Sequence, residues 1–200
     1  SVAVVLGVIV GLLVALCRIS NSKILRGISA VYVDILRGTP LIVQALIIYF
    51  GLPMFLMSVG ITFRWSTPLI ASMLVCGINS SAYVGEIIRA GLQAIDKGQM
   101  EAGRSLGLSK LQTMVKIIFP QAIRYILPAI GNEMIALLKE TSVAGYVGLV
   151  DITKAGAIIR GRTFSAFMPL IAVALVYLIL VTLLTWAVSK IERRLRKSER

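Results

Sequence analysis

Three long stretches of this chain contain no charged residue. They run from Gly38 to Phe63, from Trp65 to Gly85 and from Thr163 to Ser189. A helix needs about 20 residues to cross a hydrocarbon layer about 30 Å thick, and each stretch is long enough. Because 58% of the 200 residues are apolar, a soluble domain of this size has no core large enough to hide them. We therefore predict an all-α polytopic membrane protein.

The hydropathy pattern predicts about five transmembrane helices within one domain that covers residues 1–200. The first span is marginally long for a membrane helix, and the chain begins with Ser1 rather than Met. We therefore expect that the native N-terminus lies further upstream. The approximate ranges of the spans are 1–17, 40–58, 67–87, 121–150 and 164–188.

Basic residues alternate in number between the connections. Moving along the chain, the four connections and the tail 189–200 hold 4, 1, 5, 3 and 6 Lys and Arg residues. Connections rich in Lys and Arg face the cytoplasm. We therefore predict an outside N-terminus, with segment 96–120 and the basic tail in the cytoplasm. This placement also accounts for the net charge of +12 without a nucleic-acid partner.

Segment 96–120 has the pattern of a folded helical hairpin. Asp96 and Ser109 are each followed three positions later by Gln, which is N-capping spacing. Gly107 between them can end a helix in a left-handed conformation, and Pro120 suits the first turn of the next helix. The pattern fits either an amphipathic hairpin on the inner membrane surface or a docking element for a soluble subunit.

Three glutamates lie in or beside the apolar segments. An ionisable group at membrane depth is costly, so it usually faces a cavity, a pathway or a partner charge. Glu86 can pair with Arg89 three positions later, which favours a structural role. Glu133 and Glu140 lie in the least apolar span, which favours the wall of a polar cavity.

Neutral polar side chains also fall within the spans. Asn79, Ser80 and Ser81 lie in the third span, and Gln44 in the second is a weaker candidate of the same kind. They could hydrogen-bond a substrate, although small hydroxyl groups in membrane helices often serve only in helix packing.

Motifs for enzymatic chemistry are absent from the sequence. It contains no G-x-x-x-x-G-K-[ST] loop, so we expect that the chain itself binds no ATP. It also contains no histidine and no catalytic motif. Cys17 and Cys76 both lie in apolar surroundings and are interpreted as packing residues rather than a metal site. We predict a subunit that is not an enzyme and binds no metal or cofactor.

Segment Glu101–Pro120 resembles the cytoplasmic EAA loop of ABC importer permeases. That loop reads E-A-A, three residues, Gly, nine residues, and then I-x-L-P. Gly103 replaces the second Ala and Phe119 replaces the Leu, and both changes are mild. The matching residues are Glu101, Ala102, Gly107, Ile117 and Pro120.

Further motifs resemble the polar amino acid subfamily of these permeases. They are Y-V-D-I-L-R-G-T-P at 32–40, S-A-Y-V-G-E-I-I-R at 81–89 and K-E-T-S at 139–142. The resemblance covers nearly the whole chain, and the motifs occur in the family's order and spacing. The family usually has a longer first helix, in agreement with the expected upstream extension.

The resemblance implies a permease subunit of an ATP-driven amino acid importer in the prokaryotic cytoplasmic (inner) membrane. Two such subunits, identical or related, would form the translocation path. ATP-binding subunits that hold ATP and Mg²⁺ would dock on the cytoplasmic coupling hairpin, and an extracellular or periplasmic solute-binding protein would deliver the amino acid. The implied coupling residues are Glu101, Ala102, Gly103, Gly107, Leu108 and Pro120.

The substrate hypothesis combines this resemblance with the polar residues in the spans. Glu140, and with it Glu133 or Glu86, could neutralise the ammonium group or a cationic side chain. Asn79, Ser80 and Ser81 could hydrogen-bond the carboxylate. Acidic groups at the path favour polar or basic amino acids such as arginine, lysine or histidine.

Two other readings of the residues remain open at this point. A secondary carrier could use Glu133 and Glu140, although such carriers are normally longer and contain repeats. A non-transport membrane subunit that recruits a soluble partner would explain the hairpin but not the acidic groups within the spans.

Overall fold

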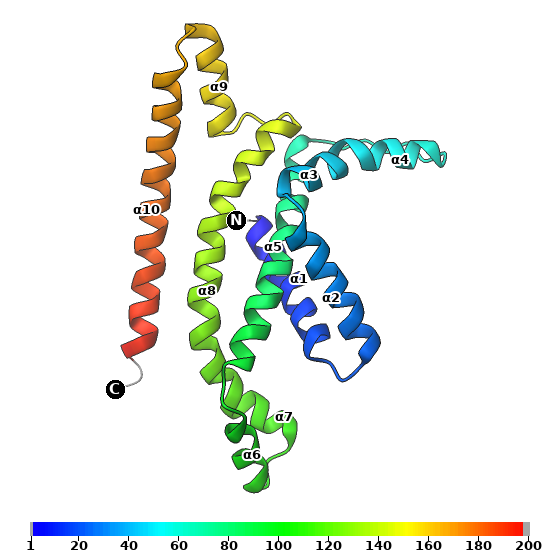
Figure 1. The fold of residues 1–200 in the computed structure, drawn as a ribbon, viewed down its shortest axis with the longest axis vertical. Coiled ribbons are helices and arrows are strands. Elements are labelled where there is room, and N and C mark those ends of the chain that lie inside the picture. The colour runs from blue at the N-terminus through cyan, green and yellow to red at the C-terminus, as the bar shows by residue number, and fades with distance from the viewer. Residues whose placement is uncertain (1, 198–200) are drawn as a thin grey trace.

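The computed structural model describes the backbone of residues 2–197 and the side chains of residues 2–193. Helices make up almost all of it, and the described residues contain no strand (Figure 1). The α-helices are α1 Val2–Ile19, α2 Lys23–Gly38, α3 Leu41–Leu46, α4 Leu52–Ser58, α5 Pro68–Gln93, α6 Lys97–Ser105, α7 Lys110–Thr113, α8 Phe119–Glu140, α9 Ile152–Thr163 and α10 Phe167–Lys197. Short π-helical turns at Ile47–Gly51 and Met114–Ile118 and a 3₁₀ turn at Thr141–Val147 join some of them.

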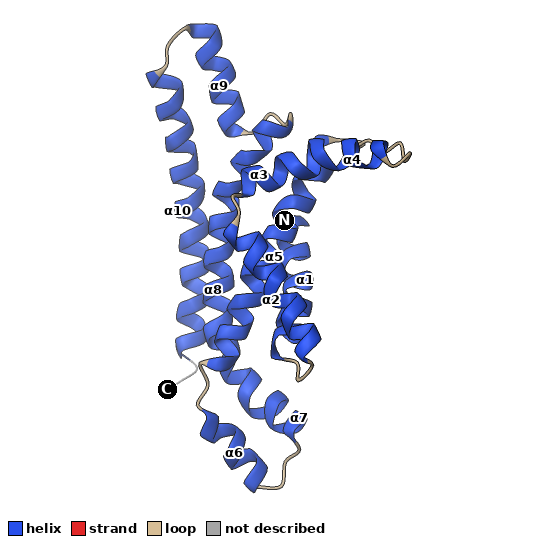
Figure 2. Ribbon diagram, turned by 45° about the vertical axis from the view of Figure 1, so that its right-hand side comes forward, coloured by secondary structure: helices blue, strands red, loops and turns tan. Residues whose placement is uncertain are grey.

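Five stretches are long and apolar enough to cross a membrane, so the predicted fold class is confirmed. They are Val2–Ile19, Leu41–Ser58, Pro68–Gln93, Lys110–Val147 and Phe167–Arg193. The α6–α7 hairpin and the C-terminal end of α10 lie toward one end of the molecule, and the α9–α10 turn lies at the other (Figures 1 and 2). Which end faces the cytoplasm stays a prediction.

The helices α1 and α5 pack closely through small residues. Gly7 and Gly11 form a G-x-x-x-G pair on α1, the spacing that lets membrane helices approach each other. A Cβ atom at Gly11 would lie 2.8 Å from the Cβ of Val84 and 2.9 Å from the carbonyl oxygen of Ser81. On the opposite side of the contact, a Cβ atom at Gly85 would lie 2.8 Å from Val14 Cγ1. The close contact therefore requires glycine on both helices, because any larger residue would collide with the other helix.

Two of the observed helices, α2 and α9, lie in segments that were predicted to be connections between spans. Helix α2 begins after Ser22, whose side chain accepts a hydrogen bond from the Leu25 amide. Helix α9 begins after Asp151, whose carboxylate accepts from the amides of Thr153 and Lys154. Both helices are short and partly polar, so a search for long apolar runs passes over them, whereas the N-cap residues were readable signals.

The second half of the hairpin is continuous with the fourth span. The chain stays helical from Lys110 through the π-helical turn Met114–Ile118 into α8. Pro120 has no backbone N–H to donate and disturbs the hydrogen-bond ladder one turn earlier, which the wider π-turn accommodates. No break therefore separates the second arm of the hairpin from the fourth span, although a new helix was expected to begin at Pro120.

Candidate functional site

Two buried amides join α5 to the bend between α2 and α3. The Asn79 amide donates to Gln44 Oε1 at 3.0 Å and to the Leu36 carbonyl at 3.2 Å. The Gln44 amide donates to the same carbonyl and to Thr39 Oγ1, both at 2.8 Å. These bonds satisfy backbone carbonyl groups at the end of α2, where no water is available at membrane depth. Both candidate substrate ligands are thus engaged within the subunit.

The next two residues of α5 point to other neighbours. Ser80 Oγ donates to Glu133 Oε1 of α8 at 3.0 Å. The Ser81 hydroxyl lies 2.6 Å from the hydroxyl of Tyr32 on α2. Consecutive helical residues point about 100° apart, so Asn79, Ser80 and Ser81 do not converge on one point. The sequence singled out the polar cluster, but it did not reveal Tyr32 as a partner.

Glu133 and Glu140 share one face of α8. They are seven positions apart, which is two helical turns and about 10 Å along the axis. Both side chains are half-buried. Thr141, next to Glu140, lines a cavity of 390 Å³ together with Cys76 and Asp151. Glu140 is thus next in sequence to a residue that lines the cavity, whereas Glu133 lies two helical turns further from it along α8.

Glu86 is held by two basic side chains near the end of α5. Its Oε2 atom lies 3.5 Å from Arg18 of α1, and its Oε1 atom accepts from Arg89 Nε at 2.9 Å and from Arg89 Nη2. Arg89 also donates to Gln93 at 2.5 Å. These contacts tie α1 to α5, in agreement with the structural role that the Glu86–Arg89 spacing favours.

The hairpin 96–120 is held by caps at both of its helices. Ser109 Oγ accepts from the Gln112 amide at 3.2 Å, and Gln112 Oε1 accepts from the Ser109 amide at 2.8 Å. This capping box was predicted and is confirmed. Asp96 caps α6 by accepting from the Gly98 amide at 2.7 Å. Gly107, with φ +85°, forms the predicted left-handed bend.

Gly103 fixes the distance between the two arms of the hairpin. It is buried, and a Cβ atom there would lie 2.5 Å from Thr113 Cγ2 and 2.9 Å from Thr113 Oγ1. Thr113 is fully buried and its hydroxyl donates to the Ser109 carbonyl at 3.0 Å. The space that the second Ala of the EAA pattern would take is therefore filled here by Thr113, which explains the departure at Gly103.

The outward side of the hairpin is open for contact. Leu106 is 81% exposed and Leu111 72% exposed. Exposed apolar residues on a polar, capped hairpin are typical of an interaction surface. The implied coupling residues Glu101, Ala102, Gly107 and Pro120 are also exposed, whereas Leu108 is half-buried.

A polar group at the start of α9 was missed by sequence reasoning. Thr153 Oγ1 donates to the hydroxyl of Tyr177 at 3.3 Å, and that hydroxyl donates to Asp151 Oδ2 at 3.5 Å. The Asp151 N-cap was its only readable signal, because Tyr177 lies within a charge-free run. Among the described residues, no group of three or more His, Cys, Asp or Glu side chains could hold a metal ion.

Comparison with known proteins gives concordant matches along the chain. The family profile described as "Binding-protein-dependent transport system inner membrane component" matches residues 6–197. A putative glutamine transport system permease protein of Rickettsia bellii is 41% identical over 194 residues, covering 97% of this chain and 86% of the relative. The arginine transport system permease protein of Bacillus subtilis is 39% identical over 198 residues, covering 99% and 88%.

Solved structures match the fold as well as the sequence. An amino acid ABC transporter crystallised with histidines has a TM-score of 0.86 and 42% identity, covering 96% of this chain and 87% of that one. An inward-facing methionine ABC transporter has a TM-score of 0.74 and 25% identity, covering 97% and 88%.

Proposed function

The chain belongs to the family of binding-protein-dependent transport system inner membrane components, and from this premise we propose that it carries polar or basic amino acids inward. At the coarser level it is an inner-membrane permease subunit of an amino acid ABC transporter. Subunits of this kind have no ATPase site of their own. Family membership argues against a secondary carrier and against a non-transport recruiting subunit.

The proposed coupling rests on the continuity between hairpin and span. Helix α7 runs through a π-turn into α8 without a break. A displacement of the hairpin by an ATP-binding subunit would therefore move α8 as a rigid lever. The capping box at Ser109 and the close contact of Gly103 with Thr113 support this role, because they keep the hairpin from absorbing the motion.

The proposed substrate class rests on Glu133 and Glu140. They lie on the same face of α8, close to a cavity at the end of the subunit away from the hairpin. A carboxylate at membrane depth requires a partner, and the ammonium or guanidinium group of arginine, lysine or histidine would supply one during passage. Relatives named for arginine and glutamine support the wider class of polar amino acids.

The complete arrangement would contain a second permease subunit, two ATP-binding subunits with ATP and Mg²⁺, and a solute-binding protein. The hairpin would face the cytoplasm and the α9–α10 turn the outside. In this orientation Glu140 lies nearer the outer side than Glu133, so an incoming amino acid would meet Glu140 first.

Substitution of the two glutamates tests the substrate proposal. Uptake of arginine, lysine, histidine and glutamine is measured in liposomes that contain the complete complex with Glu133→Gln or Glu140→Gln. We expect uptake of the three basic amino acids to fall about tenfold relative to glutamine, because each carboxylate contributes a charge-assisted contact. Asn132→Ala, one position from Glu133 on α8 but on another side, is the control. An unchanged ratio of basic to neutral amino acids in both glutamate variants would contradict the proposal.

A further inference from the structure

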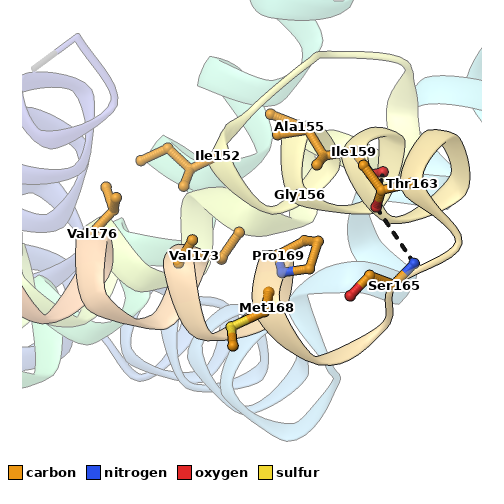
Figure 3. Close-up of a pocket in the computed structure, with 11 residues that line it drawn as sticks. Ile152, Ala155, Gly156, Ile159, Thr163, Ser165, Met168, Pro169, Val173 and Val176 are labelled. Carbon is orange, nitrogen blue, oxygen red and sulfur yellow. Dashed lines mark hydrogen bonds between the residues drawn. The ribbon is translucent and has the colours of Figure 1, made fainter.

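An apolar groove of 640 Å³ lies between α9 and the first part of α10. In Figure 3, Ile152 and Val176 lie toward one end of the groove, and Thr163 and Ser165 lie at the other. The side chains between these ends are apolar. The groove is thus lined by apolar side chains along its length and bordered by hydroxyl groups at the α9–α10 turn.

Small residues create the groove. Gly156 is buried against α10, and a Cβ atom there would collide with Val173 Cγ2. The two helices therefore touch at this point. Ala155 and Ala172 beside the contact are too small to fill the space that remains. The groove is a consequence of residue size along two packed helices rather than of a missing segment.

Trp186 near the C-terminal end of α10 indicates the position of this helix in the bilayer. It is 65% exposed, and Trp gathers at the boundary between hydrocarbon and water. At a rise of 1.5 Å per residue, Val176 and Met168 lie about 15 and 27 Å from Trp186 along α10, within a hydrocarbon layer about 30 Å thick. Lys190 lies 4.9 Å from the Trp186 ring centroid. The part of α10 that lines the groove, from Met168 to Val176, therefore lies inside the hydrocarbon layer, in the half remote from Trp186.

Two arginines of α9, Arg160 and Arg162, lie close in sequence to Thr163 and Ser165 at the polar end of the groove. From the 3.6-residue period, Arg160 and Arg162 point about 80° to either side of the groove-lining face of α9. Both are exposed, and neither forms an ion pair with any residue of the described chain. The nearest acidic residue in the sequence, Asp151, caps the far end of the same helix. The arginines also suit the negative end of the helix dipole, but that interaction leaves their guanidinium hydrogens available.

The turn between the two helices presents a further residue to the membrane boundary. Phe164 has φ +52°, a left-handed conformation that is unfavourable for a bulky residue, and it is 95% exposed. The turn therefore presents an exposed apolar ring close in sequence to the two exposed arginines.

We propose that the α9–α10 groove binds an anionic phospholipid, with an acyl chain along the groove and its phosphate held by Arg160 and Arg162. The apolar walls match an acyl chain, and a guanidinium pair matches phosphate in charge and hydrogen-bonding geometry. The apolar walls alone would also suit a helix from a second copy of the chain, whereas the two arginines without an ion pair favour an anionic occupant. The bound lipid would stabilise the packing of α9 on α10, to which the hydrogen bond between Thr153 and Tyr177 also contributes.

Native mass spectrometry of the purified full-length complex tests this site, with dioleoyl phosphatidylglycerol or dioleoyl phosphatidylcholine added to the detergent. Two variants remove the proposed contacts: Arg160→Gln with Arg162→Gln, and Ala172→Phe, which fills the groove. Their controls are Lys154→Gln on the opposite face of α9 and Ala174→Phe on another face of α10. We expect phosphatidylglycerol binding to fall about tenfold in both test variants, equivalent to the loss of one good charge-assisted contact or of the chain site.

Three outcomes would overturn the proposal. Equal binding of the two lipids would remove the role of the arginines. Unchanged phosphatidylglycerol binding in Ala172→Phe would place the lipid elsewhere. A change in the number of permease copies per complex in Ala172→Phe, with lipid binding unaffected in the arginine variant, would assign the groove to a second copy. None of these readouts depends on transport, so the lipid site can fail while the transport proposal stands.

Discussion

The helices α5 and α10 are both long enough to span the membrane, yet they are built in opposite ways. In an 18-residue window, α5 has a mean hydropathy of 1.3 and 56% of it is buried inside the subunit, whereas α10 has a mean hydropathy of 2.7 and 6% is buried. The more polar helix is thus the more enclosed one. In a bilayer the surroundings are as apolar as the side chains, so polar groups are hidden inside and apolar groups face outward.

The difference in burial between α5 and α10 means that the two helices are stabilised in different ways, α5 by contacts within the subunit and α10 by its surroundings. Helix α5 is held by close packing, hydrogen bonds and an ion pair with α1, α2 and α8. Helix α10 depends on what surrounds the subunit, because its own contacts with α8 and α9 leave most of its surface free. Substitutions on α5 should therefore change folding, and equivalent substitutions on the free surface of α10 should not.

The largest effect is expected where α1 meets α5. Gly11→Leu would force a side chain against Val84 and a backbone carbonyl, and overpacking of this kind costs about 1–3 kcal/mol or more. We expect little monodisperse protein after detergent extraction and size-exclusion chromatography. Gly27→Leu, at a position with nothing within 4 Å of the added Cβ atom, is the matched control. Equal recovery of the two variants would contradict the claim that α5 depends on close packing within the subunit.

The hairpin offers a second test of internal packing, this time with a rescue. Gly103→Ala should reduce amino-acid-stimulated ATP hydrolysis by the assembled complex about tenfold, because the new methyl group overlaps Thr113 and spreads the arms. Thr113→Ala removes both overlapping atoms, Cγ2 and Oγ1, and loses only the hydrogen bond from the hydroxyl to the Ser109 carbonyl. The double variant should regain most of the activity. Failure of the rescue would show that Gly103 is needed for contact with the partner and not for the fit with Thr113.

An intermediate effect is expected at the ion pair between α1 and α5. Glu86→Gln leaves Arg18 and Arg89 without a carboxylate in a partly buried place, which costs about 1–3 kcal/mol. A lower midpoint of thermal unfolding in detergent would report it. Lys190→Gln, which removes only an exposed contact with Trp186 on α10, should change the midpoint by much less. A larger shift for Lys190→Gln would reverse the comparison.

The smallest effects on stability are expected for single truncations, and the loss should be greater on α5 than on α10. Val75→Ala on α5, where the side chain is 2% exposed, should cost about 1 kcal/mol through the cavity that it leaves. Leu178→Ala on α10 removes more atoms, but the side chain is 61% exposed and lipid can fill the space, so a change below about 0.5 kcal/mol is expected. Unfolding in mixed micelles measures both. A greater loss for Leu178→Ala would mean that protein, not lipid, covers this side of α10.

Charge-free runs and capping residues predicted the general architecture because both depend on local sequence. The run Thr163–Ser189 is enough to indicate the last span, and Ser109 with Gln112 is enough to indicate a helix start. The partners within the bundle could not be predicted in this way. Asn79, Ser80 and Ser81 are adjacent in sequence, but their side-chain partners lie on three helices, α3, α8 and α2, and only the packing of α5 determines which.

Gly103, which replaces the second Ala of the EAA pattern, is another case in which the sequence does not reveal the partner residue. In the sequence it is a mild exception to the EAA pattern, with nothing to mark Thr113 ten positions later as its counterpart. The fold brings the two residues into contact across the Gly107 bend. Compensation between distant residues is visible only when the arms are placed side by side.

The central claim is that this subunit conducts amino acids and couples their passage to ATP hydrolysis on a partner. The most direct measurement is ATP hydrolysis by the chain reconstituted in liposomes with its ATP-binding subunit and solute-binding protein, with and without arginine, lysine, histidine and glutamine. The account predicts that hydrolysis rises with one or more of the basic amino acids and that Gly103→Ala abolishes most of the rise. Hydrolysis that no amino acid changes, in a complex that contains all of its subunits, would contradict it.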